Sequence, residues 1–367
     1  MSSAACWEVG VLGGGPAGAT AARCLAWAGV PTVLIDETTD KGGVGEGLPP
    51  GAKPLLRNLG LWEAIGGDGH LASCGNESAW GSAHLHSTHF VADPNGDGWH
   101  LDRGRFDTLL QAAARDAGAR VHAATRARRV VRARGAWEVT IGTATRRPLL
   151  RARWLIDCTG RRAWVSRRAG ATRAMTDRLV AFVVRCPRRP QVPPDHDAVT
   201  LVESAPDGWW YTSRLPSGDR VVAYLTDADD ASAWQAGTAP GFAAMLDATN
   251  HVRARVARDH TMAARPRIVA AGTSRLDRLT GEGWLAAGDA ALSLDPLSSQ
   301  GILNAVYSGM TASQAILAHL AGDGSAMEGY GQRLGAIFTT YLKNRREYYA
   351  QERRWASRPF WRRRVRS

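Results

Sequence analysis

A glycine-rich turn near the N-terminus has the residue types and spacing of a phosphate-binding loop. The sequence GGGPAG at residues 13–18 follows an apolar run at 7–12 and opens an alanine-rich segment that ends at Gly29. In such loops the first glycine permits a tight turn, the second lets the backbone approach a pyrophosphate, and the third allows close helix–strand packing. Free N–H groups at the start of the helix would face the phosphates. We therefore expect residues 7–36 to form a strand–helix–strand unit that binds a dinucleotide.

An acidic residue closes this unit. The β-branched run at 31–36 ends on Asp36, which lies 18 residues after Gly18. A carboxylate at this place can accept hydrogen bonds from a ribose. A glycine turn without a ligand is the alternative explanation, because GxGxxG alone is a weak signal. The flanking strand and helix and the spacing of the acidic residue favour the nucleotide.

Two segments far downstream indicate which dinucleotide is bound. Residues 284–291 (WLAAGDAA) are expected to form a buried strand that ends in a Gly–Asp pair, and residues 295–302 (DPLSSQGI) a loop that opens a helix. Both resemble motifs of the aromatic-hydroxylase-like flavoproteins, in which the aspartate holds the FAD ribityl chain and the loop passes beside the flavin ring. Arg105 in LDRGRFD matches an arginine of that family that contacts the cofactor. The resemblance implies FAD.

The same resemblance implies a set of cofactor-binding residues. The helix that begins near Gly301 would direct its positive end at flavin N1 and the C2 carbonyl, which stabilises the anionic reduced flavin. The implied cofactor-binding residues are Gly13, Gly15, Pro16, Ala17, Gly18, Asp36, Glu37, Glu46, Gly47, Arg105, Gly288, Asp289, Pro296, Ser299, Gln300, Gly301 and Ile302.

Further segments resemble a narrower group of flavin-dependent monooxygenases, the tryptophan-halogenase-like superfamily. GEGLPP at 45–50 is similar to a loop of tryptophan halogenases and their hydroxylase relatives. SAWGS at 78–82, GWHLDRGRFD at 98–107 and GWWYTSRLP at 208–216 look like segments of maturation flavoproteins that hydroxylate protein- or peptide-bound tryptophan. Such enzymes act in cysteine tryptophylquinone biogenesis and in peptide natural-product pathways. The resemblance, over residues 8–345, implies hydroxylation of an indole through a flavin C4a-hydroperoxide.

The lysines help to choose between hydroxylation and halogenation. Halogenases of this superfamily need a lysine in the substrate tunnel, but the sequence has only Lys41, Lys53 and Lys343, and none at 57–100 where the family lysine would lie. The departure favours hydroxylation. A flavin-dependent halogenase and a non-catalytic flavin-bearing maturation chaperone remain the alternatives.

Aromatic and histidine side chains are candidates for the substrate site. Trp80, Trp209, Trp210 and Tyr211 could stack on an indole, although a place in the core of a sheet is equally compatible with them. His84 and His86 alternate in SAHLHSTHF, so both could face a pocket from one strand. With Glu46 of the GEG loop they are the candidate catalytic residues, and a solvent-facing histidine is the alternative. Without a carboxylate or cysteine cluster beside the histidines, we predict no metal site.

The source of electrons stays open. No second strand–GxGxxG–helix unit exists, since residues 157–160 end a strand of the FAD domain. Reduced nicotinamide must therefore dock transiently at the flavin, or a separate flavin reductase must supply the electrons.

The dispersed motifs predict an α/β protein whose Rossmann-like, aromatic-hydroxylase-like FAD domain contains an inserted, mostly antiparallel substrate sheet, followed by a C-terminal helical segment. The composition is that of a soluble protein, with 44% hydrophobic and 22% charged residues and no run long enough to span a membrane. Five unpatterned cysteines and no apparent signal peptide favour the cytoplasm. The expected domains are residues 1–75, 98–165 and 270–320 for FAD, 76–97 and 166–269 for the substrate, and 321–367 for the basic C-terminal segment.

The positive charge is concentrated near the C-terminus. The chain carries +12 overall, and residues 343–367 contribute ten Lys or Arg against two Glu, a net +8. A solvated basic end is one explanation, and nucleic acid is disfavoured because no binding module accompanies the charge. Since tyrosine, tryptophan and phenylalanine are interleaved with the arginines, we predict that this segment grips an acidic peptide or protein carrying the reactive tryptophan.

Overall fold

The computed structural model describes residues 6–38, 46–142, 148–192, 196–260 and 265–366. Its first unit is built on a parallel sheet, and β1, α1 (Pro16–Trp27) and β2 form the predicted strand–helix–strand motif. Val9 and Val11 of β1 are completely buried, as expected for a central strand. The path through the sheet is β8 (Arg120–His122), β2 (Thr32–Ile35), β1 (Cys6–Leu12), β11 (Leu149–Asp157), β20 (Trp284–Ala286) and β19 (Thr280–Gly281). In addition, β10 (Ala136–Ile141) pairs antiparallel with β11, and β9 (Ala127–Ala133) pairs antiparallel with β10.

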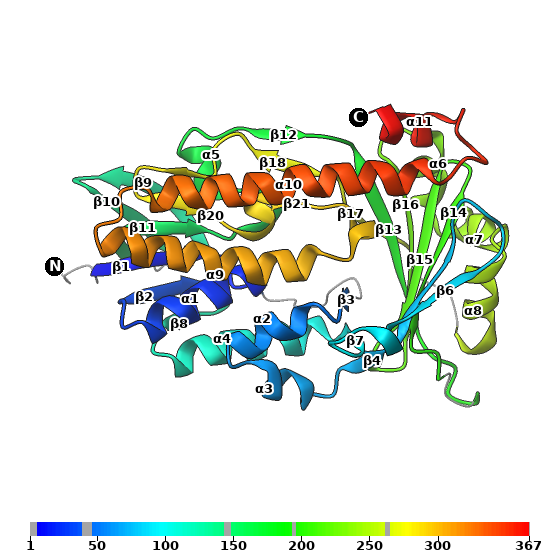
Figure 1. Ribbon diagram of the computed structural model, residues 1–367, viewed down its shortest axis with the longest axis horizontal. Coiled ribbons are helices and arrows are strands. Elements are labelled where there is room, and N and C mark those ends of the chain that lie inside the picture. The colour runs from blue at the N-terminus through cyan, green and yellow to red at the C-terminus, as the bar shows by residue number, and fades with distance from the viewer. Residues whose placement is uncertain (1–5, 39–45, 143–147, 193–195, 261–264, 367) are drawn as a thin grey trace.

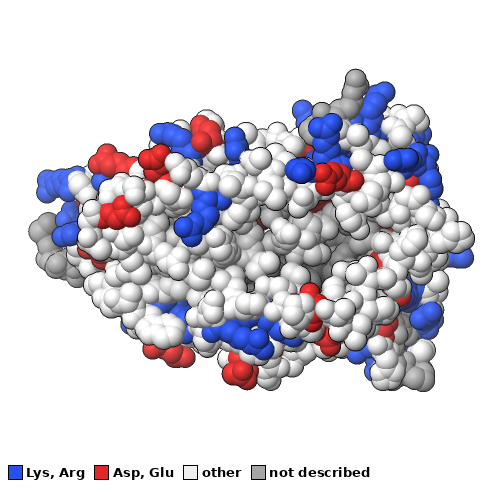
Figure 2. Space-filling view, in the orientation of Figure 1, with Lys and Arg blue, Asp and Glu red and all other residues white. Residues whose placement is uncertain are grey.

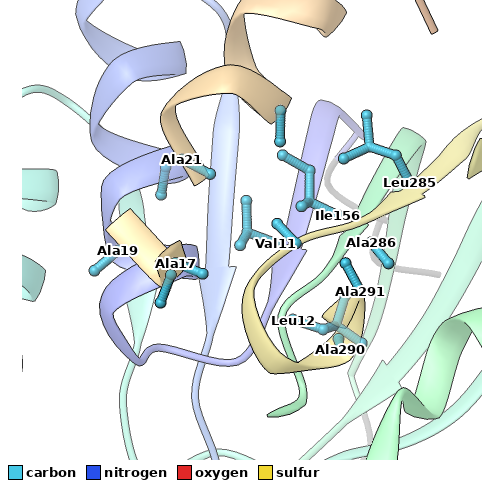
Figure 3. Packing of buried hydrophobic residues seen from close by; sticks show 14 of the residues in the cluster. Val11, Leu12, Ala17, Ala19, Ala21, Ile156, Leu285, Ala286, Ala290 and Ala291 are labelled. Atoms are coloured by element: carbon cyan, nitrogen blue, oxygen red, sulfur yellow. The ribbon is translucent and has the colours of Figure 1, made fainter. Parts of the chain in front are cut away.

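Small side chains let the helices of this unit pack closely. Helix α1 lies between α9 (Gly301–Leu320) and α4 (Arg103–Asp116) (Figure 1). Figure 3 shows its alanines close to the apolar end of β1 and to the segment after β20. A Cβ atom on Gly309 of α9 would stand 2.2 Å from the carbonyl oxygen of Ala17, so only glycine fits at this contact. The close packing fixes the N-terminus of α1 against the neighbouring strand ends.

A second sheet stands across one end of this first unit, which is called the FAD unit below (Figure 1). All of its strand pairs are antiparallel except β14 with β5, and α6 (Ala231–Ala236), α7 (Ala239–Asp247) and α8 (His251–Asp259) cover its outer face. The order is β17 (Arg267–Ala270), β13 (Leu179–Cys186), β16 (Arg220–Asp227), β15 (Gly208–Arg214), β14 (Val199–Ala205), β5 (Gly75–Ala79) and β6 (His86–His89). The predicted fold class, with an inserted sheet and C-terminal helices, is confirmed.

Short elements connect the two units. They are β3 (Glu46–Leu48), β7 (Gly98–Leu101) and β4 (Leu71–Ser73) in one small sheet; β12 (Arg173–Met175), β18 (Ser274–Leu276) and β21 (Leu292–Ser293) in another; the helices α2 (Ala52–Asn58), α3 (Trp62–Gly66) and α5 (Trp164–Arg168); and the 3₁₀ turns Phe90–Ala92, Gly160–Arg162, Gly288–Ala290 and Pro296–Ser298.

The C-terminal segment packs onto both units, and three of the aromatic residues that the sequence predicted to grip a peptide are buried instead. Helix α10 (Ala326–Ala350) runs along the FAD unit to the second sheet, and α11 (Pro359–Arg366) closes over the sheet (Figure 1). Tyr349, Phe360 and Trp361 are buried in one cluster with the sheet. The aromatic rings are core because burying them stabilises the sheet's inner face.

Among the described residues, no helix is both long enough and apolar enough to cross a membrane.

Candidate flavin and substrate site

The glycine loop has the geometry of a pyrophosphate cradle. Gly13 has a φ of 103°, and a Cβ atom there would lie 2.1 Å from the carbonyl oxygen of Cys158. A Cβ on Gly18 would lie 1.9 Å from the Gly13 oxygen, whereas a Cβ on Gly15 would meet no atom within 4 Å. No side chain caps α1, and Pro16 occupies its start. The loop is thus closed toward the protein and open where a phosphate would approach, so the residues fit FAD.

Asp36 is held in place by hydrogen bonds that link it to this loop. Its Oδ1 accepts from the backbone N–H of Gly14 and of Thr38, both at 3.2 Å, and its Oδ2 accepts from Gln111 Nε2 at 2.8 Å. Gln111 also donates to the Gly14 carbonyl at 2.8 Å. A carboxylate has further lone pairs for ribose hydroxyls. The neighbouring Glu37 is half-exposed and pairs with Arg162.

The Gly–Asp motif lies at the carboxyl end of β20, as expected. Gly288 has a φ of 60° and a Cβ there would lie 2.8 Å from the Cβ of Ala17, so the turn packs against α1. The Asp289 side chain keeps 38% of its surface exposed and lies 3.4 Å from Arg161 Nε. Arg161 also donates to the carbonyls of Gly272 and Leu294. Sequence reasoning missed Arg161, although it directly follows the strand end at residues 157–160.

A cavity of about 260 Å³ joins the predicted flavin loops to the second sheet. Figure 2 shows the surface hollowed between the two units. The sheet contributes Trp209, Tyr211 and Thr200 to its wall. Residues of the cofactor set that line it are Gly47, Asp289, Pro296, Ser299, Gly301 and Ile302. Flavin-side loops and substrate-side aromatic residues therefore share one cavity.

The start of α9 faces this cavity. Ser299 adopts a left-handed conformation with a φ of 51° just before Gln300, and no side chain caps the helix. A Cβ on Gly301 would meet no atom within 4 Å. The positive end of a 20-residue helix is thus directed at a space that could receive an anionic ring. Gln300 itself is exposed and lies outside the cavity lining.

A buried network behind the cavity connects it to α10. Asp295, which lines the cavity, accepts from Tyr349 Oη at 2.8 Å and from Arg345 Nε at 3.3 Å. Trp209 Nε1 donates to Tyr349 Oη at 3.0 Å. Arg345 Nη2 donates to Asp177 at 2.7 Å, and Tyr341 Oη accepts from the Asp295 N–H at 2.8 Å. Burial and the Asp295 carboxylate raise the pKa of Tyr349 far above its usual range, so its hydroxyl remains a donor.

Two of the four predicted stacking residues lie elsewhere. Trp210 points to the outer face of the sheet and packs against Phe242 and Tyr224, because successive side chains of a strand face opposite sides. Trp80 is buried beneath the C-terminal segment, 5.1 Å from the ring centre of Trp361. Both are core residues rather than cavity residues.

The histidines and Arg105 also lie outside the cavity. His84 precedes the edge strand β6, His86 begins it, and both side chains are exposed, so the predicted alternation on one strand facing a pocket is wrong. All four residues of the edge strand β6 are exposed. Arg105 is exposed and pairs with Asp68 at 3.0 Å. Glu46 begins β3, and its side chain lies outside what the structure describes.

No group of three or more metal-ligating side chains occurs in the part of the chain that the structure describes.

Comparison with known proteins supports the flavin assignment. A family model described as an FAD binding domain matches residues 7–338. The chain is 28% identical over 364 residues to LodB of Marinomonas mediterranea, which is named as a putative FAD-dependent oxidoreductase; the match covers 96% of this chain and 95% of that protein. A 1H-pyrrole-2-carbonyl-peptidyl-carrier-protein chlorinase of Pseudomonas fluorescens is 30% identical over 186 residues, 45% of this chain and 41% of that one.

Solved structures share the fold. The myxobacterial chondrochloren halogenase CndH superposes with a TM-score of 0.86 at 22% identity, covering 98% of this chain and 86% of that chain. The peptidyl tryptophan dihydroxylase QhpG has a TM-score of 0.80 at 25% identity, covering 98% and 79%. The chain therefore belongs to the FAD-binding domain family and is an FAD-dependent oxidoreductase.

Proposed function

We propose that the chain is a monooxygenase that hydroxylates the indole ring of a tryptophan held in a peptide or protein. The observation that carries the proposal is the shared cavity, in which Trp209 and Tyr211 of the sheet face the loops at Asp289 and Gly301. Bound FAD would supply the activated oxygen. The protein would orient the ring against it, exclude water and hold the reacting atoms together.

The lysines support hydroxylation over halogenation. Lys53 bonds the Asn95 carbonyl and lies 4.6 Å from the ring centre of Trp99, away from the cavity. Lys343 is exposed on α10, and Lys41 falls outside the described residues. Among the described residues, the cavity wall contains no lysine to hold a hypohalous acid. Since two relatives are named as halogenases, halogenation remains the second candidate.

A polypeptide substrate is supported by relatives whose names refer to peptidyl substrates, a tryptophan dihydroxylase and a carrier-protein chlorinase. Figure 2 also shows arginines gathered over the C-terminal helix, so an acidic polypeptide would be attracted there. Exposed arginines of the C-terminal segment include Arg346, Arg353 and Arg362.

The test is a mass measurement. The purified enzyme with FAD, dioxygen and either reduced nicotinamide or a separate reductase is incubated with acidic single-tryptophan peptides, in chloride or bromide. Gain of oxygen supports the proposal, and gain of halogen supports the second candidate. Flavin reoxidation that is independent of the peptide and leaves its mass unchanged would contradict both, and would point to a flavin-bearing chaperone.

A further inference from the structure

A hydroxyl on the cavity wall is backed by a buried histidine. Thr200 of β14 lines the cavity, and its Oγ1 lies 3.0 Å from Nε2 of His100. His100 comes from β7 of the small connecting sheet and is only 1% exposed. A hydroxyl within hydrogen-bond reach of an imidazole is the arrangement by which proteins move a proton to or from a substrate. This pair was not among the residues that sequence reasoning selected.

The strands place the pair next to both halves of the cavity. His100 stands opposite Gly47, a cavity residue, in the β3–β7 ladder. On the sheet, Val202 pairs with Tyr211, so Thr200 lies two residues farther along the same face. There Tyr211 Oη and Ser213 Oγ are 2.9 Å apart. The inner face of the sheet therefore carries hydroxyl groups at the end near Gly47 and tryptophan at the other end.

The surroundings keep the imidazole neutral. Burial lowers the pKa of His100 to about 4, while the carboxylate of Asp197 and the backbone of Arg214 act in the opposite direction. The charges of Arg220 and Arg214 add to the effect of burial. Near neutral pH the ring thus has a free lone pair. When Nε2 accepts the Thr200 hydroxyl, the ring's own proton resides on Nδ1.

We propose that Thr200 and His100 form the proton acceptor for the aromatic substrate, an inference that rests on the proposed function. One atom of dioxygen bonds to a ring carbon with a π-electron pair of the indole, the other leaves as water, and reduced flavin provides the two electrons. The C–H bond at that carbon then breaks and its electron pair restores the aromatic ring. The released proton passes to Thr200 Oγ1 as the threonine proton passes to His100 Nε2.

Ring deuteration tests this step. The probe is a single-tryptophan peptide with a fully deuterated indole, compared with its unlabelled form. Wild-type enzyme should form product from both at the same rate. In Thr200→Val the step loses its acceptor, so product formation should fall at least tenfold, about 1.4 kcal/mol in the barrier, and a primary isotope effect should appear. Thr200→Ser, which keeps the hydroxyl, should behave like wild type, and His100→Gln like Thr200→Val.

The outcomes separate this inference from the function on which it rests. If wild-type enzyme inserts no oxygen, the proposed function fails. If it does, and Thr200→Val shows wild-type rates or a slow rate with no isotope effect, the relay is wrong.

A readout independent of turnover uses FAD-loaded protein with ¹⁵N-labelled histidine, with the His100 signals assigned by their loss in His100→Gln. We expect a neutral ring protonated on Nδ1 from pH 6 to 8. An imidazolium, or a ring protonated on Nε2, would overturn the inference.

Discussion

Replacing Tyr349 with phenylalanine should lower the unfolding free energy, because one hydroxyl group bonds two residues of the cavity wall. The ring is completely buried, and its hydroxyl donates to Asp295 and accepts from Trp209. Phenylalanine keeps the packing and removes only the hydroxyl. The lost bond to a carboxylate contributes about 1.5–3 kcal/mol, and the stranded indole N–H costs about 1–3 kcal/mol. Because both effects depend on one hydroxyl they do not add fully, and we expect a net loss near 3 kcal/mol.

Urea unfolding of the FAD-free protein measures this loss, and flavin fluorescence titration measures the FAD dissociation constant. Tyr348→Phe is the matched control, because Tyr348 is adjacent in sequence and 41% exposed, and its hydroxyl bonds Ser78 rather than the buried network. FAD affinity should fall in Tyr349→Phe, since Asp295 and Trp209 both line the cavity. If Tyr349→Phe unfolds within about 0.5 kcal/mol of Tyr348→Phe, a change typical of neutral surface sites, the network does not support the wall as argued.

Three further predictions concern the cofactor loop and the C-terminal segment. Gly15→Ala should fold normally, because its Cβ meets open space, but it should weaken FAD binding about tenfold. Gly18→Ala should lower the unfolding free energy, because its Cβ would clash with Gly13. Urea titration and FAD binding measurements distinguish the two variants. Arg364→Met should cost about 1.5–3 kcal/mol, because the buried Asp227 carboxylate loses its bonds to Arg364 but keeps one to Arg363, and a loss under about 1 kcal/mol in urea unfolding would contradict this. Exchanging exposed C-terminal arginines for glutamine should raise KM for an acidic peptide at low salt and leave FAD content unchanged; equal KM values would remove the basis for electrostatic docking. The residues to exchange are Arg346, Arg353 and Arg362.

Removal of the C-terminal segment would test docking less cleanly than substitution of its exposed arginines. Truncation after Lys343 would remove Arg345, Tyr349 and Trp361, all of them buried. The shortened protein would lose the support of the cavity wall together with any docking surface. Loss of activity in that variant would therefore not distinguish the two, whereas changes at exposed side chains do.

Local motifs could be predicted from the sequence because they are formed by consecutive residues. The glycine loop and the Gly288–Asp289 turn depend on backbone conformation and close approach, which glycine spacing indicates. No local sequence motif indicates the contact of Gln111 with Asp36, because the two residues are 75 positions apart. The same holds for His100 and Thr200, which meet only because the second sheet docks on the first unit.

Aromatic residues were hard to assign for a related reason. Three consecutive ones, at 209–211, alternate across the sheet, so only Trp209 and Tyr211 could reach the cavity once the register was fixed. Tyr349 and Trp361 looked like surface residues because arginines surround them in sequence. Some of those arginines pair with acidic residues of the sheet and its loops, as Arg364 does with Asp227 and Arg358 with Asp207.

The bridge formed by Arg345 between Asp177 and Asp295 has a consequence for biosynthesis. Both aspartates leave the ribosome well before α10 does, and domains generally begin to fold in the order of synthesis. Until residues 345–364 are synthesised, the two carboxylates lack the guanidinium of Arg345, and the inner face of the second sheet lacks its aromatic cover. We therefore expect the nascent chain to bind FAD weakly, and firm binding to follow only after α10 docks.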